Sequence, residues 1–324
     1  MRILLTGASS FTGCHFVRAL AAAGHEVVVT MTRPDAGGYA DEPVRAERVA
    51  AVRRAAAETR FGLRFGDAAF VDLVRSGRFD LLCHHAADVT NYKSPDFDAV
   101  GAVANNVRGL GSVLEAFRAA EGRAVVLTGS VFEGGEGAGS EGLPHFSPYG
   151  LSKALTAEVF RYECGRRGLP LGKFVIPNPF GPLEEPRFTA YLVKAWLAGQ
   201  TPGVKTPAYV RDNIHVSALA GAYARFAEET AARAGTPGFC RTSPSGYVES
   251  QGAFALRFAR EMEPRLGVPC PVDLAEQTEF AEPRIRIGTD AAAMTRDEER
   301  RAWDEIAEFY LRAHRPAAAA GGRG

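Results

Sequence analysis

Residues 2–13 read RILLTGASSFTG, an apolar run followed directly by a turn of small residues. The run from Arg2 to Thr6 has the continuous apolar character of a strand that is buried on both faces of a parallel sheet. A helical pattern follows from Cys14 to Ala23, and a second strand pattern, HEVVVT, covers His25 to Thr30. This order and spacing predict a strand–turn–helix–strand unit, the βαβ crossover.

The turn between this strand and helix suits a close approach of an anion. Gly7 permits a tight turn, Gly13 lets the helix pack on the strand, and the helix N-terminus attracts negative charge. Ser10 occupies the middle small position, where a serine fits and can donate a hydrogen bond. We therefore predict a dinucleotide pyrophosphate site, the alternative being an ordinary structural turn. The candidate residues are Gly7, Ser9, Ser10, Phe11, Thr12 and Gly13.

Strand and helix patterns continue to alternate as far as Ile176. Further strands are expected at 61–65, 79–84, 124–127 and 173–176, and helices at 44–58, 68–76 and 102–120. Such alternation is typical of a doubly wound parallel sheet, a Rossmann-like α/β fold whose ligands lie at the carboxyl ends of the strands. The predicted strand ends carry Gly7, Arg33, Asp67, Ala86, Thr128 and Pro177, which makes these residues candidates for one shared site.

The end of the second strand bears on the choice of cofactor. An acidic residue there would accept a hydrogen bond from a ribose hydroxyl and repel a 2′-phosphate. The sequence has Thr30-Met31-Thr32-Arg33 instead, and the planar guanidinium of Arg33 suits a phosphate. The sequence therefore favours NADP(H) over NAD(H), unless Arg33 is an ordinary surface arginine.

Two further strand ends offer cofactor contacts. Asp67 could contact an adenine amino group or cap the next helix, and the sequence leaves both open. Ala86 and Ala87 are small enough for a cofactor to lie against the fourth strand. The preceding His84 and His85 are expected to pack in the core, because no carboxylate or cysteine is spaced to complete a metal site. We expect no metal.

Tyr149 and Lys153 form the candidate acid–base pair. They are four residues apart, so a helix through residues 154–166 would place both side chains on one face. A phenol titrates near ~10 and is a poor acid–base group at neutral pH. A neighbouring ammonium favours the phenolate and lowers its pKa, which would let Tyr149 exchange a proton with a substrate hydroxyl or carbonyl. The pair alone is a weak signal, because a half-buried tyrosine beside a surface lysine is common.

The regular alternation stops after Ile176. We assign residues 1–177 to a dinucleotide-binding domain, to which residues 212–240 return, and residues 178–211 and 241–314 to a smaller C-terminal substrate-binding cap. The Pro- and Arg-rich stretch 241–288 is expected to be irregular, with a closing helix at 295–314. Residues 315–324 are expected to be a disordered tail.

The composition restricts partners and location. Hydrophobic residues make up 46% of the 324 residues, enough for a core, and Lys+Arg equal Asp+Glu at 38 each. Balanced charge gives no reason to expect nucleic acid or an anionic membrane, whereas a small anionic molecule needs only a local positive pocket. Five widely spaced cysteines without a Cys-x-x-Cys pair indicate a reduced, cytoplasmic protein. No apolar run reaches the ~18 residues needed to span a bilayer.

Several motifs occur together in one order. They are Thr6-Gly7-x5-Gly13, Asn106-Val-x-Gly, Tyr149-x-x-x-Lys153, Asn178-Pro-Phe-Gly-Pro and Arg211-Asp-x-Ile-His-Val. With these motifs the chain resembles the extended short-chain dehydrogenase/reductases, in particular the nucleotide-sugar epimerase/dehydratase/reductase group. The resemblance implies NAD(P)-dependent hydride transfer at C4 of a nucleotide-linked sugar, by a 4-epimerase or a 4-keto-sugar reductase. A non-catalytic protein of the same fold that senses a dinucleotide is the alternative.

The resemblance also assigns catalytic roles. Tyr149 would be the acid–base group, Lys153 would hold the nicotinamide ribose and tune Tyr149, and Asn106 would orient the local backbone and a water. The family's hydroxyl at the end of the fifth strand falls on Thr128 or Ser130, depending on whether the Val-Phe pair or the strand end is aligned.

Substrate contacts and assembly follow from the same resemblance. Asn178 would face the substrate and Arg211 would grip the nucleotide diphosphate. Arg284 would assist, or would be a solvated loop charge. Helices around residues 102–118 and 154–166 could form a family-like homodimer.

Overall fold

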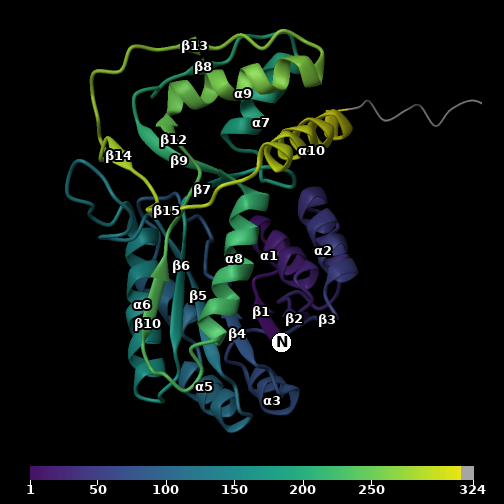
Figure 1. Cartoon of the computed structure of the whole chain (residues 1–324), viewed down its shortest axis with the longest axis vertical. Helices are drawn as coiled ribbons and strands as arrows, with labels where there is room; N and C mark the ends of the chain where they lie inside the picture. Colours follow the sequence, from purple (N-terminus) through teal and green to yellow (C-terminus); the bar gives the residue numbers. More distant parts are fainter. Residues whose placement is uncertain (315–324) are drawn as a thin grey trace, which may run out of the picture.

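The computed structural model describes residues 1–314, and the tail predicted at 315–324 lies outside the described residues. Seven parallel strands form the main sheet in the order β10-β6-β5-β4-β1-β2-β3 (Figure 1). They are β1 (Arg2–Thr6), β2 (Glu26–Thr30), β3 (Glu58–Arg60), β4 (Leu81–His84), β5 (Ala124–Ser130), β6 (Leu171–Ile176) and β10 (Phe239–Thr242). The order reverses between β1 and β4, which confirms the predicted doubly wound sheet and places a ligand crevice at that point.

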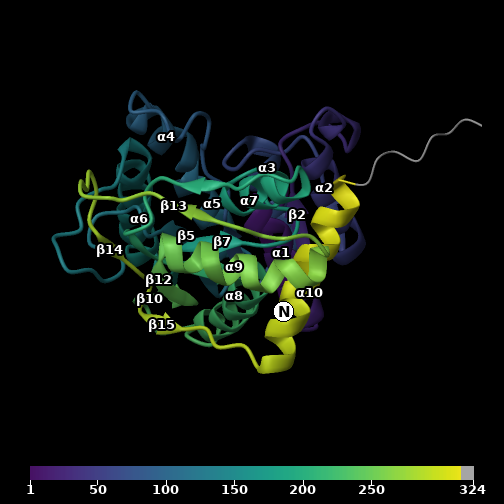
Figure 2. The same ribbon diagram turned by 90° about the horizontal axis from the view of Figure 1, so that it is seen from above.

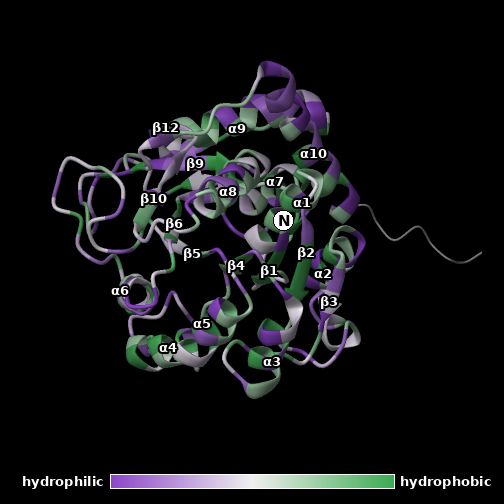
Figure 3. Ribbon diagram, turned by 60° about the horizontal axis from the view of Figure 1, so that its bottom comes forward, coloured by the Kyte–Doolittle hydropathy of each residue, from purple (hydrophilic) through white to green (hydrophobic). Residues whose placement is uncertain are grey.

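Helices cover both faces of this sheet. One face carries α1 (Phe11–Ala22), α2 (Pro43–Ala55) and α8 (Val216–Ala231), and the other carries α3 (Ala68–Gly77), α5 (Leu110–Ala119) and α6 (Pro148–Gly165). Successive strand residues enter opposite cores: Ile3 and Leu5 pack on the first face, whereas Leu4 packs on the second. Burial on both faces explains why the strands read as continuous apolar runs, coloured green in Figure 3.

A smaller cap lies beyond the carboxyl ends of the strands (Figures 1 and 2). Its sheet contains β7 (Asn178–Phe180), β9 (Val210–His215), β12 (Tyr247–Ser250) and β14 (Ile285–Arg286), and its helices are α7 (Phe188–Leu197), α9 (Gln251–Leu266) and α10 (Arg296–His314). Phe180 anchors the cap, with its ring centroid 5.1 Å from that of Phe254 and 5.6 Å from that of Trp303. The remaining elements are η1 (Gly37–Tyr39), α4 (Ala99–Asn106), β8 (Gly203–Val204), β11 (Pro244–Ser245), β13 (Asp273–Leu274) and β15 (Asp290–Ala291).

Three sequence expectations about the elements are wrong. The third strand is β3, not residues 61–65, because this edge strand is made of polar Glu58, Thr59 and Arg60 and carries no apolar signal. The helix expected at 102–120 is broken between α4 and α5, where Gly109 adopts a positive φ of 56°. The break between the two helices packs tightly against the backbone at Gly66. A Cβ on Gly66 would lie 1.8 Å from the Arg108 carbonyl oxygen.

The third wrong expectation is that residues 241–288 are irregular, because they contain the long helix α9. Phe254, Phe258 and Met262 recur every four residues and are buried on one face of that helix. Residues 211 and 212, between which a domain boundary was expected, both lie in β9, a strand of the cap sheet.

The five cysteines are free thiols, four of them buried. No helix within residues 1–314 is both long enough and apolar enough to cross a membrane.

Candidate active site

The Gly-rich turn lies against the end of β4. Gly7 has a φ of 78°, and a Cβ there would lie 2.7 Å from the backbone nitrogen of Ala86. The Thr6 hydroxyl oxygen accepts hydrogen bonds from the backbone N–H groups of His85 (3.2 Å) and Ala86 (3.1 Å). The ends of β1 and β4 are therefore in direct contact at the reversal point of the sheet, and Ala87 continues from the same edge.

Ser10 caps α1 and directs its side chain into the turn. Its hydroxyl accepts from the Gly13 N–H at 3.1 Å and donates to the Gly7 carbonyl at 2.9 Å. A Cβ on Gly13 would lie 2.3 Å from that carbonyl, so glycine is required there. The Ser10 hydroxyl, which the sequence suggested as a donor to the cofactor, is thus used inside the turn. The groups that could bind an anion are the first backbone N–H groups of α1, beginning at Phe11 and Thr12. This arrangement fits a dinucleotide pyrophosphate.

Arg33 is engaged by acidic neighbours. Its guanidinium donates to the Glu42 carboxylate and the Gly38 carbonyl, and lies 3.2 Å from an Asp41 carboxylate oxygen. It also stacks over the buried ring of Tyr39, 4.6 Å from the centroid. Acceptors therefore already surround the guanidinium that the sequence assigns to a 2′-phosphate.

Arg45 is a site residue that the sequence analysis missed. It donates to the Ser9 hydroxyl of the Gly-rich turn at 3.2 Å and to Glu42 at 3.2 Å, and it shares the Tyr39 ring with Arg33. It lies at the start of α2, where only its three-residue spacing from Glu42 distinguishes it from other helix arginines.

Asp67 occupies the N-cap position of α3, as the capping alternative expected, but its side chain makes no hydrogen bond to that helix. Its carboxylate lies 3.9 Å from the Arg108 guanidinium, and the side chain is half-buried. The adenine contact stays a prediction.

Tyr149 and Lys153 lie on the first two turns of α6, which Ser147 caps by accepting from the Gly150 N–H at 3.3 Å. The Tyr149 ring packs beside Tyr92 and Phe97, with centroids 5.2 and 6.1 Å apart. Burial, and then the charges of Glu133 and Tyr92, raise the pKa of Tyr149 above its ordinary value. The acidified phenol expected from the sequence is therefore wrong for the protein alone, because desolvation outweighs nearby positive charge.

Lys153 is almost completely buried, at 4% exposure. Burial lowers its pKa to about 8, while the Glu133 charge partly offsets this by raising it. Such a lysine is still mostly protonated at neutral pH but titrates within the biological range, which is a feature of functional sites.

A buried ion-pair network behind this pair was also missed. Glu133, fully buried, accepts from the Ser130 backbone N–H at 2.7 Å and pairs with Lys173. Lys173 also donates to Glu136 at 2.7 Å, and Arg241 of β10 lies 3.2 Å from the second Glu136 oxygen. A lysine inside the apolar strand LGKFVI was the one sequence signal of this network.

Asn106 fixes the backbone beside the site. Its side-chain oxygen accepts from the Asp88 N–H at 2.8 Å and its amide donates to the Thr156 hydroxyl at 3.2 Å. Its backbone carbonyl lies 3.2 Å from His84 Nε2, and Thr6 lies 3.0 Å from the other ring nitrogen. The geometry supports the orienting role implied for Asn106, and His84 packs in the core as expected.

The two candidate hydroxyls differ in surroundings. Thr128 is buried and its hydroxyl lies 3.0 Å from His85 Nδ1. Ser130 is half-buried, and its hydroxyl accepts from the Phe132 N–H at 3.2 Å. Both lie at the carboxyl end of β5, so the choice between them stays a prediction.

The predicted substrate residues lie on the cap side. Pro177 connects β6 to β7, whose first residue, Asn178, pairs in register with Asn213. Arg211 donates to the carbonyls of Val210 and Pro283 and to the Glu282 carboxylate (2.8 Å). Arg284 stacks on Phe280 at 4.4 Å. To hold a diphosphate, Arg211 would have to exchange these partners.

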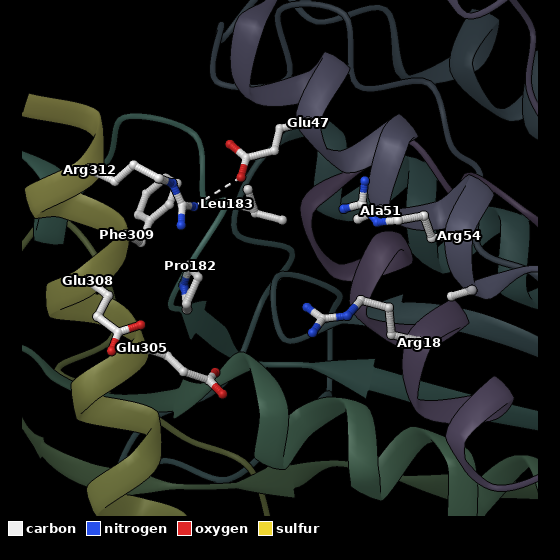
Figure 4. A pocket seen from close by; sticks show the side chains of 11 residues that line it. Arg18, Glu47, Ala51, Arg54, Pro182, Leu183, Glu305, Glu308, Phe309 and Arg312 are labelled. Carbon is white, nitrogen blue, oxygen red and sulfur yellow. Dashed lines mark hydrogen bonds and ion pairs between the residues drawn. The ribbon is translucent and has the colours of Figure 1, made fainter. Parts of the chain in front are cut away.

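A cavity of about 450 Å³ is lined by Pro182, at the end of the Asn178-Pro-Phe-Gly-Pro motif, but by none of the candidate site residues (Figure 4). It separates α1 and α2 from α10, with Arg18 and Arg54 on one wall and Glu305 and Glu308 on the other.

The fold and this strand-end cluster define a dinucleotide-binding α/β enzyme with a smaller cap. The chain belongs to the NAD dependent epimerase/dehydratase family, whose profile matches residues 3–237. This confirms the resemblance seen in the sequence and a nicotinamide dinucleotide as the cofactor.

Solved structures of similar fold include UDP-sugar 4-epimerases. UDP-glucuronic acid 4-epimerase from Bacillus cereus, in complex with UDP-glucuronic acid and NAD, is 17% identical with a TM-score of 0.72, covering 97% of this chain and 100% of that chain. UDP-glucose-4-epimerase from Stenotrophomonas maltophila, with bound NAD and formylated UDP-arabinopyranose, is 19% identical with a TM-score of 0.73, covering 97% and 99%. No curated protein matches the chain by sequence. Nothing in these comparisons supports a non-catalytic sensor.

Proposed function

We propose that the protein catalyses 4-epimerisation of a UDP-linked sugar with NAD recycled in place. The observation that carries the proposal is the joint position of the Tyr149–Lys153 pair and the Gly-rich turn at one edge of the sheet. The similar 4-epimerase structures with bound NAD support epimerisation over net reduction of a 4-keto sugar.

The chain's residues supply proton transfer and positioning. Bound NAD would accept the hydride from C4 and return it to the opposite face of the ring. Tyr149 takes the O4 proton as the carbonyl forms and returns it as the carbonyl is reduced, so proton and hydride balance over the cycle. The buried Lys153 ammonium, one helical turn away, would favour the phenolate in the complex with cofactor and substrate, whereas burial raises the pKa of Tyr149 in the protein alone. Asn178 and Arg211 would hold the sugar nucleotide from the cap.

NAD(H), rather than the NADP(H) expected from the sequence, is the dinucleotide that we propose. Glu42 accepts from both Arg33 and Arg45. Its carboxylate neutralises part of the positive charge that a 2′-phosphate would need, and it would repel that phosphate. The NAD bound in the similar structures points the same way.

The test is incubation with UDP-glucose and with UDP-glucuronic acid, followed by chromatography of the sugar nucleotides. Formation of the C4 epimer without added NADH or NADPH is expected. Product that accumulates only in proportion to added reduced cofactor would instead establish a reductase. If the protein binds NAD but forms no product under either condition, UDP-glucose and UDP-glucuronic acid are not its substrates.

We propose that the protein acts as a homodimer. Leu155 and Tyr162, seven residues apart on α6, are 43% and 70% exposed, and Val100 of α4 is 76% exposed. Large apolar side chains exposed together are typical of an interface. Tyr162→Glu should give a monomer by light scattering, whereas Tyr191→Glu, at an exposed position of α7, should leave the dimer intact.

A further inference from the structure

His85 lies where three separate segments of the chain meet. Its Nε2 is 2.9 Å from the Ser10 hydroxyl and 3.1 Å from the Thr12 hydroxyl, both in the Gly-rich turn. Its Nδ1 is 3.0 Å from the Thr128 hydroxyl at the end of β5. The ring also packs edge-on against Phe16, with centroids 5.1 Å apart. One imidazole thus joins the dinucleotide-binding turn to a candidate catalytic hydroxyl.

The hydrogen bonds around Ser10 decide which ring nitrogen carries the proton. The Ser10 hydroxyl hydrogen is directed to the Gly7 carbonyl, and its oxygen also accepts from the Gly13 N–H. Ser10 can therefore offer His85 only a lone pair, so Nε2 carries the hydrogen and donates it.

The imidazole is neutral, because burial and the Lys153 charge lower the pKa of His85 to about 3. A neutral imidazole has one N–H, so Nδ1 is an acceptor and the Thr128 hydroxyl donates to it. This bond directs the Thr128 hydroxyl hydrogen to His85, so the Thr128 oxygen acts as an acceptor toward any other hydroxyl.

We propose that His85 is a positioning residue that couples the dinucleotide-binding turn to the Thr128 hydroxyl. The proposal rests on the proposed function, in which both groups serve one site. Either half of the imidazole can be tested separately, because an amide can replace one ring nitrogen at a time. In His85→Asn the amide reaches the Nδ1 position and can accept from Thr128, whereas in His85→Gln it reaches the Nε2 position and can donate to Ser10 and Thr12.

The experiment measures NAD⁺ binding by calorimetry and turnover of UDP-glucose or UDP-glucuronic acid at saturating NAD⁺. For His85→Asn we expect a Kd for NAD⁺ raised about fivefold, the effect of one lost hydrogen bond, with kcat nearly unchanged. For His85→Gln we expect an unchanged Kd and a kcat lowered about tenfold. His85→Leu should show both losses, and the exposed His314→Asn should show neither.

Imidazole ¹⁵N chemical shifts give a readout that is independent of turnover. The wild type should show His85 as the Nε2–H tautomer, and Thr128→Val should shift only the Nδ1 resonance. An Nδ1–H tautomer, or equal effects of the Asn and Gln variants on Kd and kcat, would overturn the inference. Failure of the wild type to bind NAD⁺ would instead contradict the proposed function itself.

Discussion

Replacing Lys153 by Met should make the protein more stable while removing its activity. Burial lowers the pKa of this lysine from 10.5 to about 8, so the unfolded chain holds the proton more tightly than the folded one. At about 1.36 kcal/mol per pKa unit, the folded state at pH 7 carries a cost of about 3 kcal/mol. Methionine has a similar length and no charge to desolvate, so Lys153→Met should recover most of this free energy.

The pH dependence of this gain distinguishes it from a packing effect. Below pH 8 the lysine is protonated in both states and the full cost applies. Between pH 8 and 10.5 the folded lysine loses its proton while the unfolded one keeps it, so wild-type stability rises with pH and the advantage of the variant disappears. Above 10.5 the charge no longer contributes.

Denaturant unfolding at pH 7 and pH 10 measures both effects. The midpoint of Lys153→Met should exceed that of the wild type at pH 7, with an unchanged m-value, and approach it at pH 10. The protein should first be freed of dinucleotide, because a ligand that binds only the folded state adds its own stabilisation. Lys194→Met, the same change at an exposed position of α7, should show no pH-dependent gain. The reasoning would be refuted by a variant that is less stable than the wild type at pH 7, or by a stability difference between the two that does not change with pH. Turnover of Lys153→Met should fall about 100-fold or more.

Tyr149→Phe should lower turnover about 100-fold or more, because the proton carrier is removed, and leave the Kd for NAD⁺ unchanged in calorimetry; an unchanged rate would defeat the acid–base role. Glu42→Ala should raise the affinity for NADP⁺ relative to NAD⁺ about tenfold or more, because it frees two guanidinium groups and removes a repelling charge; an unchanged ratio would show that Glu42 does not select the cofactor. Glu133→Gln should move the alkaline limb of the pH–rate profile to lower pH, because the Glu133 charge raises the pKa of Lys153; a limb that stays in place would separate that limb from Lys153.

The sequence by itself determined the parallel sheet and the edge at which the site lies. The apolar runs of buried strands, the small residues of the turn from Gly7 to Gly13, and the four-residue spacing of Tyr149 and Lys153 are local patterns. A local pattern depends only on neighbours along the chain, so it can be read without knowing the fold. The helix α9 was equally local, and its apolar spacing was obscured by the surrounding Pro and Arg residues.

Only the tertiary structure decided the electrostatics of the site. Glu42 reaches Arg33 from the loop that follows β2, Glu133 meets Lys173 from the next strand of the sheet, and His85 joins segments up to 75 residues away. The sign of the Tyr149 pKa shift was misjudged for the same reason. Burial is a property of the whole packed fold, and desolvation of the phenol raises the pKa of Tyr149 more than the nearby positive charge of Arg187 lowers it.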